Sequence, residues 1–583
     1  MTSFEIERLH FRAEDVKTWS ALNSKHSNWP VVYLLDAAGK QSALRDVYVG
    51  ESLNVAARMR QHLDTPEKQH LDTLRVVLDD SFNKSVALDL ESYLIRLLAG
   101  DGAFRVLNRN EGITDADYYS RSMYQDSFRE VFEQLKIDGI FTRTIPEIEN
   151  SDLFKLSPFK ALTQDQAIAV EDILEGLFTD LRSTASSTIV IQGNPGTGKT
   201  VVAIFLLKLL ADIKGARPGD ERDSDSLFSE FFTEGYSVLL ADFRMAIVVP
   251  QQSLRESIKR VFKKTPGLNA SMVLTPFDVG QAEQPFDLLI VDEMHRLNQR
   301  SNQPSGPLNK KFRDITTKLF GSDDTSKTQL DWIRAQSRHQ IFLLDADQSV
   351  RPGDLPPEAL GDLTRSAIAQ HRHYPLSTQM RVQAGADYVR YIHDILKPDP
   401  LAVIAPLPQM FTGYDFQLFD SLPAMLGAIR GQEEEHGLAR VLAGYAWEWR
   451  SKNDPSLFDI ELDGQRLRWN STAVDWIASP ESRDEVGSIH TVQGYDLNYA
   501  GVIIGPDLRF DSNSGRLVFD RNSYFDKKGK ENNKVLDKTY TDEDLLRFVT
   551  NVYRVLLTRG IRGTYVYVCD PALREHLRTF IPQ

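Results

Sequence analysis

The sequence is poor in cysteine and has no long hydrophobic run. Among its 583 residues Cys569 is the single cysteine, which excludes an internal disulfide and any zinc site built from several thiolates. Such usage is typical of a reducing compartment. The longest apolar stretch, near Phe205, is short and contains Lys208, so no membrane span is expected. The first residues, MTSFEIERLH, are polar and acidic and lack the features of a signal peptide. We therefore expect a soluble, cytoplasmic protein.

The sequence also lacks an excess of positive charge. Its formal net charge is −14, which argues against a protein that coats nucleic acid by charge alone. A local basic groove remains compatible with this value, because net charge averages over all faces. With 41% apolar residues, 34 glycines and 26 prolines, the composition is that of a globular protein. The length predicts about three or four domains.

What the sequence does contain is a glycine-rich loop between an expected strand and an expected helix. Residues 193–200 read GNPGTGKT and match the phosphate-loop pattern at every fixed position. The β-branched run 188–191 before it predicts a buried strand, and the apolar run 201–210 after it predicts a helix. A loop between a strand and a helix can direct its backbone N–H groups and the N-terminus of the helix at bound phosphates. This context therefore favours a phosphate-binding loop over a chance glycine-rich turn. The loop predicts binding of ATP and Mg²⁺, with Lys199 at the β- and γ-phosphates and Thr200 on Mg²⁺. Its other members are Gly193, Asn194, Pro195, Gly196, Thr197 and Gly198.

An acidic pair follows a second apolar run. The expected strand 286–291 ends in Asp292 and Glu293. Two carboxylates at the end of a strand are weak evidence alone, but downstream of a phosphate loop they predict nucleotide hydrolysis. Asp292 is expected to hold Mg²⁺, and Glu293 to orient or deprotonate the attacking water.

Several further positions resemble the motifs of superfamily 1 helicases. Pro250 and Gln251, after the expected strand 245–249, resemble the motif whose loop touches a nucleic-acid backbone. The resemblance implies that Gln166 reads the adenine edge and that Gln348 senses the γ-phosphate. It also implies an arginine from each of two later motifs at the γ-phosphate, and a motif that links the ATP state to the nucleic-acid track. These residues are Arg381 and Arg559 for the first role, and His490, Gln493 and Gly494 for the second, with Asp496 at a commonly acidic position.

Three segments resemble more specifically the Schlafen-type P-loop NTPase domain, over about residues 160–583. They read YAWEW, VQGYDLNYAGVIIGPDL and VYRVLLTRGIRGTYVY. The resemblance implies an α/β fold with two RecA-like lobes, 161–375 and 376–583, whose doubly wound parallel sheets surround one ATP. Strand unwinding does not follow, because the large inserted subdomains of processive helicases are not seen. Four tryptophans could stack bases, although core packing is the commoner role. They are Trp447, Trp449, Trp469 and Trp476.

The first hundred residues carry an ordered set of polar residues. Apolar runs 31–35 and 47–49 flank a polar, glycine-containing loop, which predicts a hairpin. In an expected helix over 54–63, Arg58 and His62 stand four apart and share a face. In a second one, over 85–98, Glu91 stands among apolar positions, and a buried carboxylate needs a partner.

This set resembles the GIY-YIG nuclease family over about residues 28–112. Tyr33 lies in VVY, at the first motif, and Tyr48 lies in YVG, at the second. The resemblance implies a small antiparallel sheet with surrounding helices, and metal-dependent phosphodiester hydrolysis. The implied roles are metal ligand for Glu91, base or water positioner for Tyr33, hydrogen-bond network for Tyr48 and His62, charge stabilisation for Arg58, and a structural or phosphate-side role for Asn108. The first motif lacks its Gly and Ile, and the long spacing between the tyrosines implies a longer hairpin loop.

These observations together predict an ATP-dependent endonuclease, acting on nucleic acid in DNA repair or antiviral defence. A nuclease head over 1–112 and a helical connector over 113–160 would precede the helicase-like motor. Residues 298–340 are expected to be largely a polar loop with a helix near Trp332, and the acidic insertion 212–243 has no functional interpretation. Three alternatives stay open: an ATPase switch that licenses cleavage without unwinding, RNA in place of DNA, and an inactive head that only binds.

Overall fold

The computed structural model describes residues 4–37, 44–109, 118–217, 227–301, 303, 305–345, 351–398, 408–472, 476–492 and 495–582. The chain forms two compact units. Unit 1 comprises Met1–Phe178, Val201–Asp242 and Ser257–Met272, and unit 2 comprises Thr179–Thr200, Phe243–Glu256 and Val273–Gln583. The four-part domain division expected from the sequence stays a prediction.

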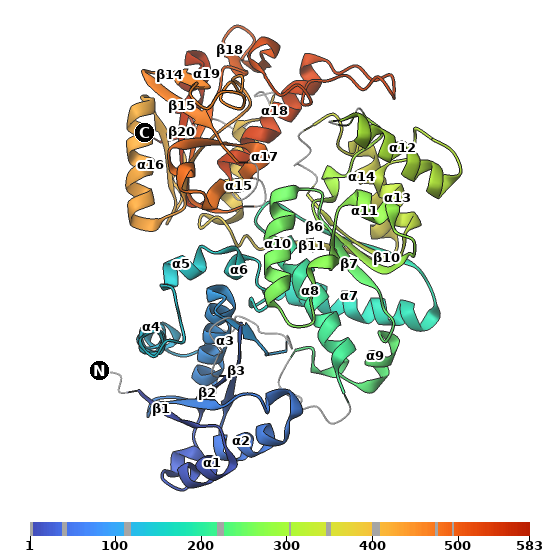
Figure 1. Cartoon of the computed structure of the whole chain (residues 1–583). Coiled ribbons are helices and arrows are strands. Elements are labelled where there is room, and N and C mark those ends of the chain that lie inside the picture. The colour runs from blue at the N-terminus through green and yellow to red at the C-terminus, as the bar shows by residue number, and fades with distance from the viewer. Residues whose placement is uncertain are drawn as a thin grey trace. The chain divides into compact units, whose positions relative to one another are not determined.

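Unit 1 begins with a five-stranded sheet (Figure 1). Its order is β1-β4-β2-β3-β5, with β1 Glu5–His10, β2 Val31–Asp36, β3 Arg45–Ser52, β4 Thr73–Leu78 and β5 Phe104–Val106. The antiparallel pairing of β2 with β3 confirms the predicted hairpin. The expected purely antiparallel sheet is corrected in one respect, since β5 pairs parallel to β3. A parallel pair needs a crossover connection, which the long helix α3 contributes here.

The two predicted helices of this region are present. They are α2, Val55–Asp64, and α3, Lys84–Asp101, and α1, Ala13–Ser20, precedes them. The side chains of Asn54 and Asn83 accept hydrogen bonds from N–H groups in the first turns of α2 and α3, which fixes where each helix starts. Leu90, Leu94 and Leu98 of α3 share a buried core with β2 and β3.

Most of the described part of the predicted connector is helical. It contains α4 Arg121–Ile137, α5 Ile145–Glu149 and α6 Asp152–Lys155. Phe128 and Phe132 of α4 belong to the same buried core as α3, so this segment packs as part of unit 1.

Four more helices lie wholly or partly in unit 1. They are α7 Gln164–Ser183, α8 Lys199–Gly215, α9 Glu234–Leu239 and α10 Gln252–Lys264. The insertion that had no interpretation contributes aromatic side chains to packing: Phe228 contacts Phe205, and Phe231 and Tyr236 contact Phe178. Its described C-terminal part is therefore built into the core of unit 1.

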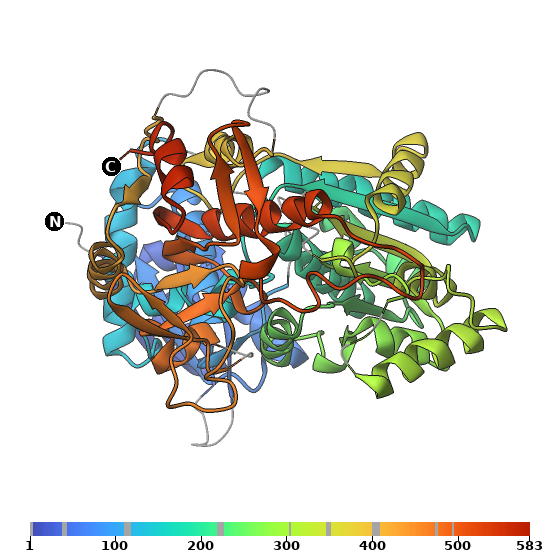
Figure 2. The same cartoon turned by 90° about the horizontal axis from the view of Figure 1, so that it is seen from above.

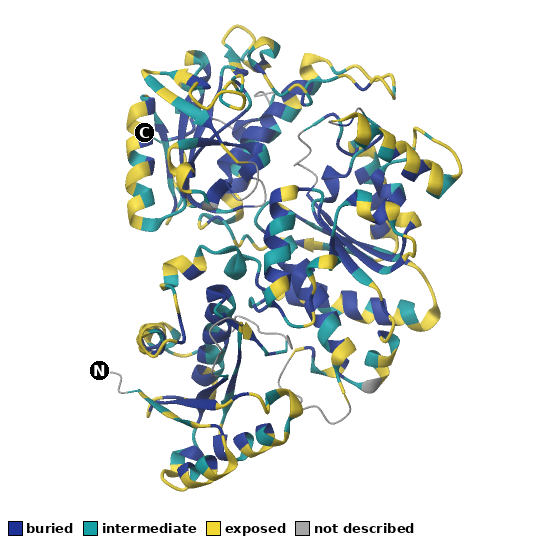
Figure 3. Cartoon of the chain, in the orientation of Figure 1, coloured by how far each residue is buried: buried dark blue, intermediate teal, exposed yellow. Residues whose placement is uncertain are grey.

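The first sheet of unit 2 is wholly parallel, with the order β11-β6-β10-β9-β7-β8. The strands are β6 Ser187–Gly193, β7 Met245–Val248, β8 Val273–Leu274, β9 Phe286–Val291, β10 Ser337–Leu344 and β11 His373–Leu376. Figure 3 shows the strands β6, β7, β9 and β10 largely buried, which explains their apolar sequences, whereas the edge strand β11 is mostly not buried. Because neighbouring parallel strands end at one edge, the residues after β6, β9 and β10 are brought together.

The helices of this part include one that the sequence did not predict. They are α11 Pro276–Gln281, α12 Gly306–Phe320, α13 Gln329–Ala335 and α14 Pro357–Ala369. The helix near Trp332 is confirmed as α13, but α12 lies where a polar loop was expected. Phe312 and Ile315 of α12 pack on Trp332, and the rest of this helix is mostly polar, which hid its short apolar stripe.

The second sheet of unit 2 has the order β12-β20-β17-β13-β16-β15-β14 and is parallel except for the β14–β15 pair. Its strands can be followed in yellow-orange to red in Figure 1 and Figure 2. They are β12 Asp415–Phe419, β13 Ala439–Ala443, β14 Ile460–Leu462, β15 Gln465–Trp469, β16 Glu485–Ser488, β17 Leu497–Ile504 and β20 Gly560–Val568.

The described residues of unit 2 also form a separate hairpin and the helices α15 to α19. The hairpin is β18 Leu508–Asp511 with β19 Arg516–Phe519, and the helices are α15 Gly385–Ile395, α16 Leu422–His436, α17 Ile489–Val492, α18 Asp542–Leu557 and α19 Pro571–Arg578. Trp469 and Trp476 are buried core residues, which agrees with the favoured interpretation. The parallel sheets confirm the expected α/β class. Among the described residues, no helix combines the length and apolarity of a membrane span.

A buried carboxyl after β17 gives a test of the fold. The Tyr553 hydroxyl donates to Asp507 Oδ1 at 2.5 Å, and burial raises the pKa of Asp507 to about 7. An unfolded aspartate has a pKa of about 3.9, so between these values only the folded state holds the proton. Stability from this group is complete below the unfolded pKa and is lost as the pH rises through about 7.

We expect Asp507→Asn to remove this pH dependence. The amide keeps an acceptor for Tyr553 and cannot titrate. Between about pH 5 and 8, the wild-type free energy of unfolding should fall relative to the variant, by a few kcal/mol at most, since one pKa unit equals about 1.4 kcal/mol. Thermal melts at several pH values measure the difference, and parallel curves for the two proteins would show that Asp507 does not hold the proton.

Candidate functional site

The phosphate loop follows β6 and is closed by its own lysine. Lys199 Nζ donates to the carbonyl oxygens of Gly193 at 2.6 Å and Asn194 at 3.0 Å, and lies 3.4 Å from Asp345 Oδ2. Gly196 has φ +86° and Gly198 has φ +76°, a backbone region that disfavours side chains. The loop therefore has glycines where its conformation requires them, and the Lys199 side chain folds back onto the loop carbonyls.

The predicted metal residues meet at the ends of β6 and β9. The Thr200 hydroxyl donates to Asp292 Oδ2 at 2.8 Å, and Asp292 Oδ1 accepts the Glu293 N–H at 2.9 Å. Asp292 is 1% exposed, and burial raises its pKa, as does the charge of Glu293. A hydroxyl and a buried carboxylate side by side are oxygen ligands of the kind Mg²⁺ takes in nucleotide sites, so the residues present fit this ion.

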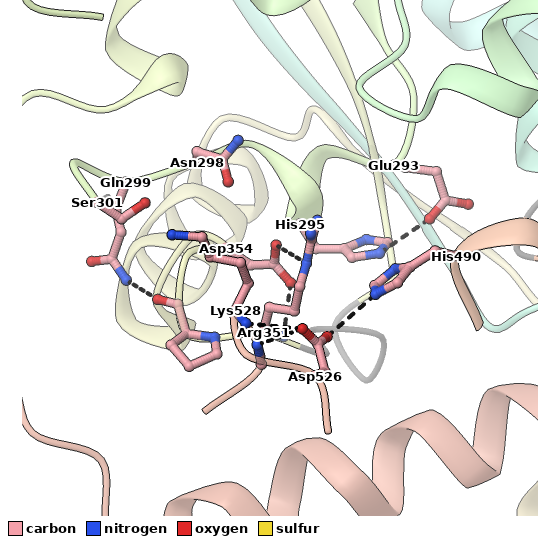
Figure 4. A network of polar contacts seen from close by, with 12 residues as sticks. Glu293, His295, Asn298, Gln299, Ser301, Arg351, Asp354, His490, Asp526 and Lys528 are labelled. Atoms are coloured by element: carbon pink, nitrogen blue, oxygen red, sulfur yellow. Dashed lines mark hydrogen bonds and ion pairs between the residues drawn. The ribbon is translucent and has the colours of Figure 1, made fainter. Parts of the chain in front are cut away.

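Glu293 lies next to a histidine that the sequence analysis did not single out. Its backbone has φ +49°, a strained conformation for a glutamate, and its Oε2 lies 3.1 Å from Nε2 of His295 (Figure 4). The distance is that of an ion pair, but the two atoms are not aligned as a hydrogen bond. Burial acts to raise the pKa of Glu293, but His295 and Arg296 outweigh it and hold this pKa below its usual range.

The segment with Arg381 lies directly on the phosphate loop. Gln379 Nε2 donates to the Pro195 carbonyl at 2.7 Å, and the Met380 N–H donates to the Gly196 carbonyl at 2.8 Å. A Cβ on Gly196 would lie 2.7 Å from Cβ of Arg381. Arg381 is thus beside the loop, as predicted, and its guanidinium forms an ion pair with Asp496.

Arg559 is near the same centre but is fully enclosed. Its guanidinium donates to the carbonyls of Val555 and Tyr495, each at 3.2 Å. Burial and the neighbouring charge of Arg381 lower the pKa of Arg559 to about 9. It is therefore still a cation at neutral pH. The charges of Asp496 and Glu293 also act on it, so both predicted arginines share one electrostatic environment with the acidic pair.

The other predicted nucleotide residues are placed less directly. Gln348, Gln493 and Gly494 lie outside the described residues. Gln166 is buried in unit 1, where its side-chain oxygen accepts the Thr163 N–H at 3.1 Å, and its role at adenine stays a prediction.

His490 belongs to a polar network near the acidic pair. Its Nε2 lies 3.3 Å from Asp526 Oδ2 (Figure 4), and burial lowers its pKa although Asp526 acts to raise it. Asp526 was not predicted, because it is far along the chain in a loop with no motif of its own. Asp345 was not predicted either. It lies directly after β10, which pairs with both β6 and β9, and a carboxylate directly after an apolar strand is the signal that could have identified it.

In unit 1, the predicted nuclease residues of β2, β3 and α2 form a buried aromatic cluster. The Tyr33 hydroxyl lies 2.8 Å from Nε2 of His62, and both side chains are fully buried. The Tyr48 ring lies 6.2 Å from that of Tyr33 and 5.2 Å from that of His62. A Cβ on Gly50 would lie 2.3 Å from the Tyr33 oxygen, so glycine is needed at this position of the second motif.

Charged neighbours act on this cluster. Burial raises the pKa of Tyr33, as do Tyr48 and Glu91, whereas the charge and a hydrogen bond of Arg58 lower it. Arg58 and Glu91 therefore both influence the Tyr33 hydroxyl electrostatically, and their roles in a nuclease site stay predictions. Asn108 pairs with the backbone of Val49, accepting its N–H at 3.1 Å and donating to its carbonyl at 2.7 Å. This geometry favours the structural alternative for Asn108.

Lys68 is a member of the cluster that sequence reasoning missed. It ends a short 3-10 helix, Pro66–Lys68, after α2. Its Nζ lies 2.9 Å from Nδ1 of His62 and 3.5 Å from the centre of the Tyr48 ring. The contact of Lys68 with His62 could not be predicted from helical periodicity, because α2 ends at Asp64 and Lys68 lies beyond it.

A known protein family covers the phosphate loop and both sheets of unit 2. Residues 186–570, more than half of the chain, match the family model described as Schlafen group 3, DNA/RNA helicase domain. The chain belongs to this Schlafen family. The matched residues include the loop, the acidic pair and both arginines, so the Schlafen-type resemblance is confirmed, together with its helicase-like character.

Two curated proteins and one solved structure are similar to parts of this Schlafen group 3 protein. Uncharacterized protein YPL245W of Saccharomyces cerevisiae is 26% identical over 465 residues, which cover 74% of this chain and 93% of the yeast protein. The ATP-dependent DNA helicase RecG of Aquifex aeolicus is 28% identical over 200 residues, 33% of this chain and 24% of RecG. The crystal structure of Arterivirus nonstructural protein 10 (helicase) matches with a TM-score of 0.26 and 13% identity, over 69% of this chain and 64% of that chain. A TM-score this low does not establish a shared fold.

The N-terminal cluster lies before the residues that match the Schlafen family model. The GIY-YIG resemblance of this part therefore rests on its own residues and geometry, and the roles of its members stay predictions.

Proposed function

We propose that this Schlafen group 3 protein is an ATP-dependent nucleic-acid-processing enzyme whose helicase-like ATPase drives or licenses cleavage by an N-terminal GIY-YIG nuclease. The single observation that carries the ATPase part is the meeting of Thr200 with Asp292, 2.8 Å apart, beside the loop closed by Lys199. In a glycine-rich turn without a nucleotide-binding role, the threonine would not be expected to lie against a buried carboxylate.

Each residue of this centre has a role in hydrolysis. Lys199 would leave the loop carbonyls for the phosphates, and Thr200 and Asp292 would hold Mg²⁺, which supplies positive charge against the phosphate oxygens. Glu293 would orient the attacking water once its contact with His295 gives way. Arg381 and Arg559 supply cations near the position where negative charge builds.

The nuclease part is supported by the cluster around Tyr33. Tyr33, Tyr48 and His62 are in mutual contact, and the charges of Arg58 and Glu91 act on the same hydroxyl. Glu91 on α3 would hold the divalent metal, and Arg58 would stabilise the charge on the phosphorane. An inactive head would not need charges of both signs acting on one buried tyrosine.

A physical link between the two activities is supported by contacts within unit 1. Helix α10 begins directly after Gln251, in the segment resembling the motif that touches nucleic acid. In its second half, Ser257 and Arg260 donate to one carboxylate oxygen of Asp152 in α6, at 2.7 and 2.5 Å. Lys264, at its end, donates to the carbonyl of Gly102, which caps the α3 helix that carries Glu91. Movement of α10 would thus reach the nuclease helix.

We expect Asp152→Ala to weaken this link and to spare each activity. Coupling energies of about 1–3 kcal/mol correspond to about 5- to 150-fold effects, so the stimulation of cleavage by ATP should fall at least about 5-fold. ATP turnover should stay within about twofold of wild type, because Asp152 is not part of the nucleotide centre. Paired ATPase and cleavage assays measure both. The matched control is Asp126→Ala on the exposed face of α4. Unchanged ATP stimulation in Asp152→Ala would show that α10 does not couple the two activities.

The ATPase proposal is tested by measuring ATP turnover with and without single- and double-stranded DNA and RNA. Stimulation of turnover by at least one of the four nucleic acids is expected, and a turnover rate that none of them changes would oppose the proposal. Strand displacement on a tailed duplex then separates a translocating motor from a switch, because a switch is stimulated without displacing the strand.

A further inference from the structure

Both ring nitrogens of His62 have a defined partner. Nε2 lies 2.8 Å from the Tyr33 hydroxyl, and Nδ1 lies 2.9 Å from Nζ of Lys68. His62 is fully buried, and burial, Lys68 and Arg58 lower its pKa to about 2. The ring is therefore neutral under ordinary conditions and carries a single proton.

The chemistry of lysine decides where that proton is. An ammonium group donates hydrogen bonds and cannot accept them. Nδ1 must then be the acceptor for Lys68, which leaves the ring proton on Nε2. The Nε2–H group donates to the Tyr33 oxygen, and Arg58 is a second donor to the same tyrosine.

Lys68 itself is held in place. Its ammonium group lies 3.5 Å from the centre of the Tyr48 ring, a favourable cation–π distance. Its backbone N–H donates to Thr65 and its carbonyl accepts from Leu71, so the turn that carries it is fixed at both sides. The side chain of a free surface lysine would not make two such contacts with one aromatic cluster.

We propose that Lys68 is a positioning residue that locks His62 in its Nε2–H tautomer and so makes the Tyr33 oxygen an acceptor. The relevance to catalysis rests on the proposed nuclease function. The consequence concerns the direction of proton transfer. A proton from the attacking water cannot pass through Tyr33 to His62, because Nε2 already carries one. Tyr33, whose raised pKa means that it keeps its own proton, then orients the water with its hydroxyl, while His62 and Arg58 donate to its oxygen.

The test uses the full chain with ¹⁵N-labelled histidine rings, in which NMR distinguishes the two tautomers. His62→Gln assigns the His62 signals by their loss. Wild type should show the Nε2–H tautomer alone. Lys68→Met keeps the length of the side chain but removes the donor, so an Nδ1–H population should appear. Lys68→Arg restores a cationic donor and should restore the Nε2–H form.

Cleavage of labelled DNA and RNA by the same proteins gives the second readout. Lys68→Met should cut about 10- to 100-fold more slowly than wild type, as for other residues that act by orienting a catalytic group, and Lys68→Arg should regain most of the rate. An unchanged tautomer in Lys68→Met, or an Nδ1–H tautomer in wild type, would overturn the inference. If wild type cuts no substrate while the tautomer responds to Lys68→Met, the inference about Lys68 stands and the nuclease proposal fails.

Discussion

Lys199→Ala should lower ATP turnover by at least about 10²-fold. In the structure Lys199 Nζ donates to two carbonyls of its own loop and lies 3.4 Å from Asp345 Oδ2. The γ-phosphate would replace these partners and take the cation at the point where charge builds during hydrolysis. Loss of one preorganised donor at such a point costs about 10²–10³-fold in rate. Phosphate release under saturating ATP measures the effect.

The matched control is Lys214→Ala, an exposed lysine in the last turn of the same helix, α8. Its ATP turnover should equal that of wild type. Because Lys199 also balances the buried Asp345, a thermal melt must show that Lys199→Ala is folded before its rate is interpreted. A folded Lys199→Ala protein with wild-type turnover would mean that the loop is not the site of hydrolysis.

Glu91→Gln should abolish nucleic-acid cleavage and leave ATP turnover intact. Glu91 is half-buried on α3, and its charge acts on Tyr33. An amide keeps the shape of the side chain but loses the charge that would hold a divalent metal. Since a metal ion contributes several kcal/mol to phosphoryl chemistry, we expect at least about a 10²-fold loss. Time courses on labelled substrates with Mg²⁺ measure the rate.

Glu133→Gln, on an exposed position of α4, is the control for this substitution and should cut at the wild-type rate. Equal cleavage by Glu91→Gln and wild type would place the active carboxylate elsewhere in the chain. Loss of ATP turnover in Glu91→Gln would instead point to a folding defect, because Glu91 belongs to the nuclease cluster of unit 1.

The sequence predicted the parts of the nucleotide centre that depend on local chemistry. Glycines at positive φ, a lysine and threonine at the start of a helix, and carboxylates after an apolar strand all follow from local rules. Parallel strands then bring such residues to one edge, so Asp292 and Thr200 meet although they are far apart in the chain.

The parts that sequence reasoning missed depend on tertiary packing. Gln379 contacts the loop through the Pro195 carbonyl, and any polar side chain in that segment would have looked the same in the sequence. Lys68 reaches His62 from a turn outside the helix, where no periodic pattern applies. Helix α12 could not be predicted from the sequence because its few buried apolar residues pack around Trp332 and give a weak periodic pattern.

The most direct test of the account is to incubate the full chain with labelled single- and double-stranded DNA and RNA, with Mg²⁺, in the presence and absence of ATP. We predict that at least one substrate is cut, that ATP increases the cutting, and that Lys199→Ala removes this increase while Glu91→Gln removes the cutting itself. Intact substrates under every condition, in a preparation that hydrolyses ATP, would contradict the nuclease half of the account. Cutting that is indifferent to ATP would contradict the proposed coupling.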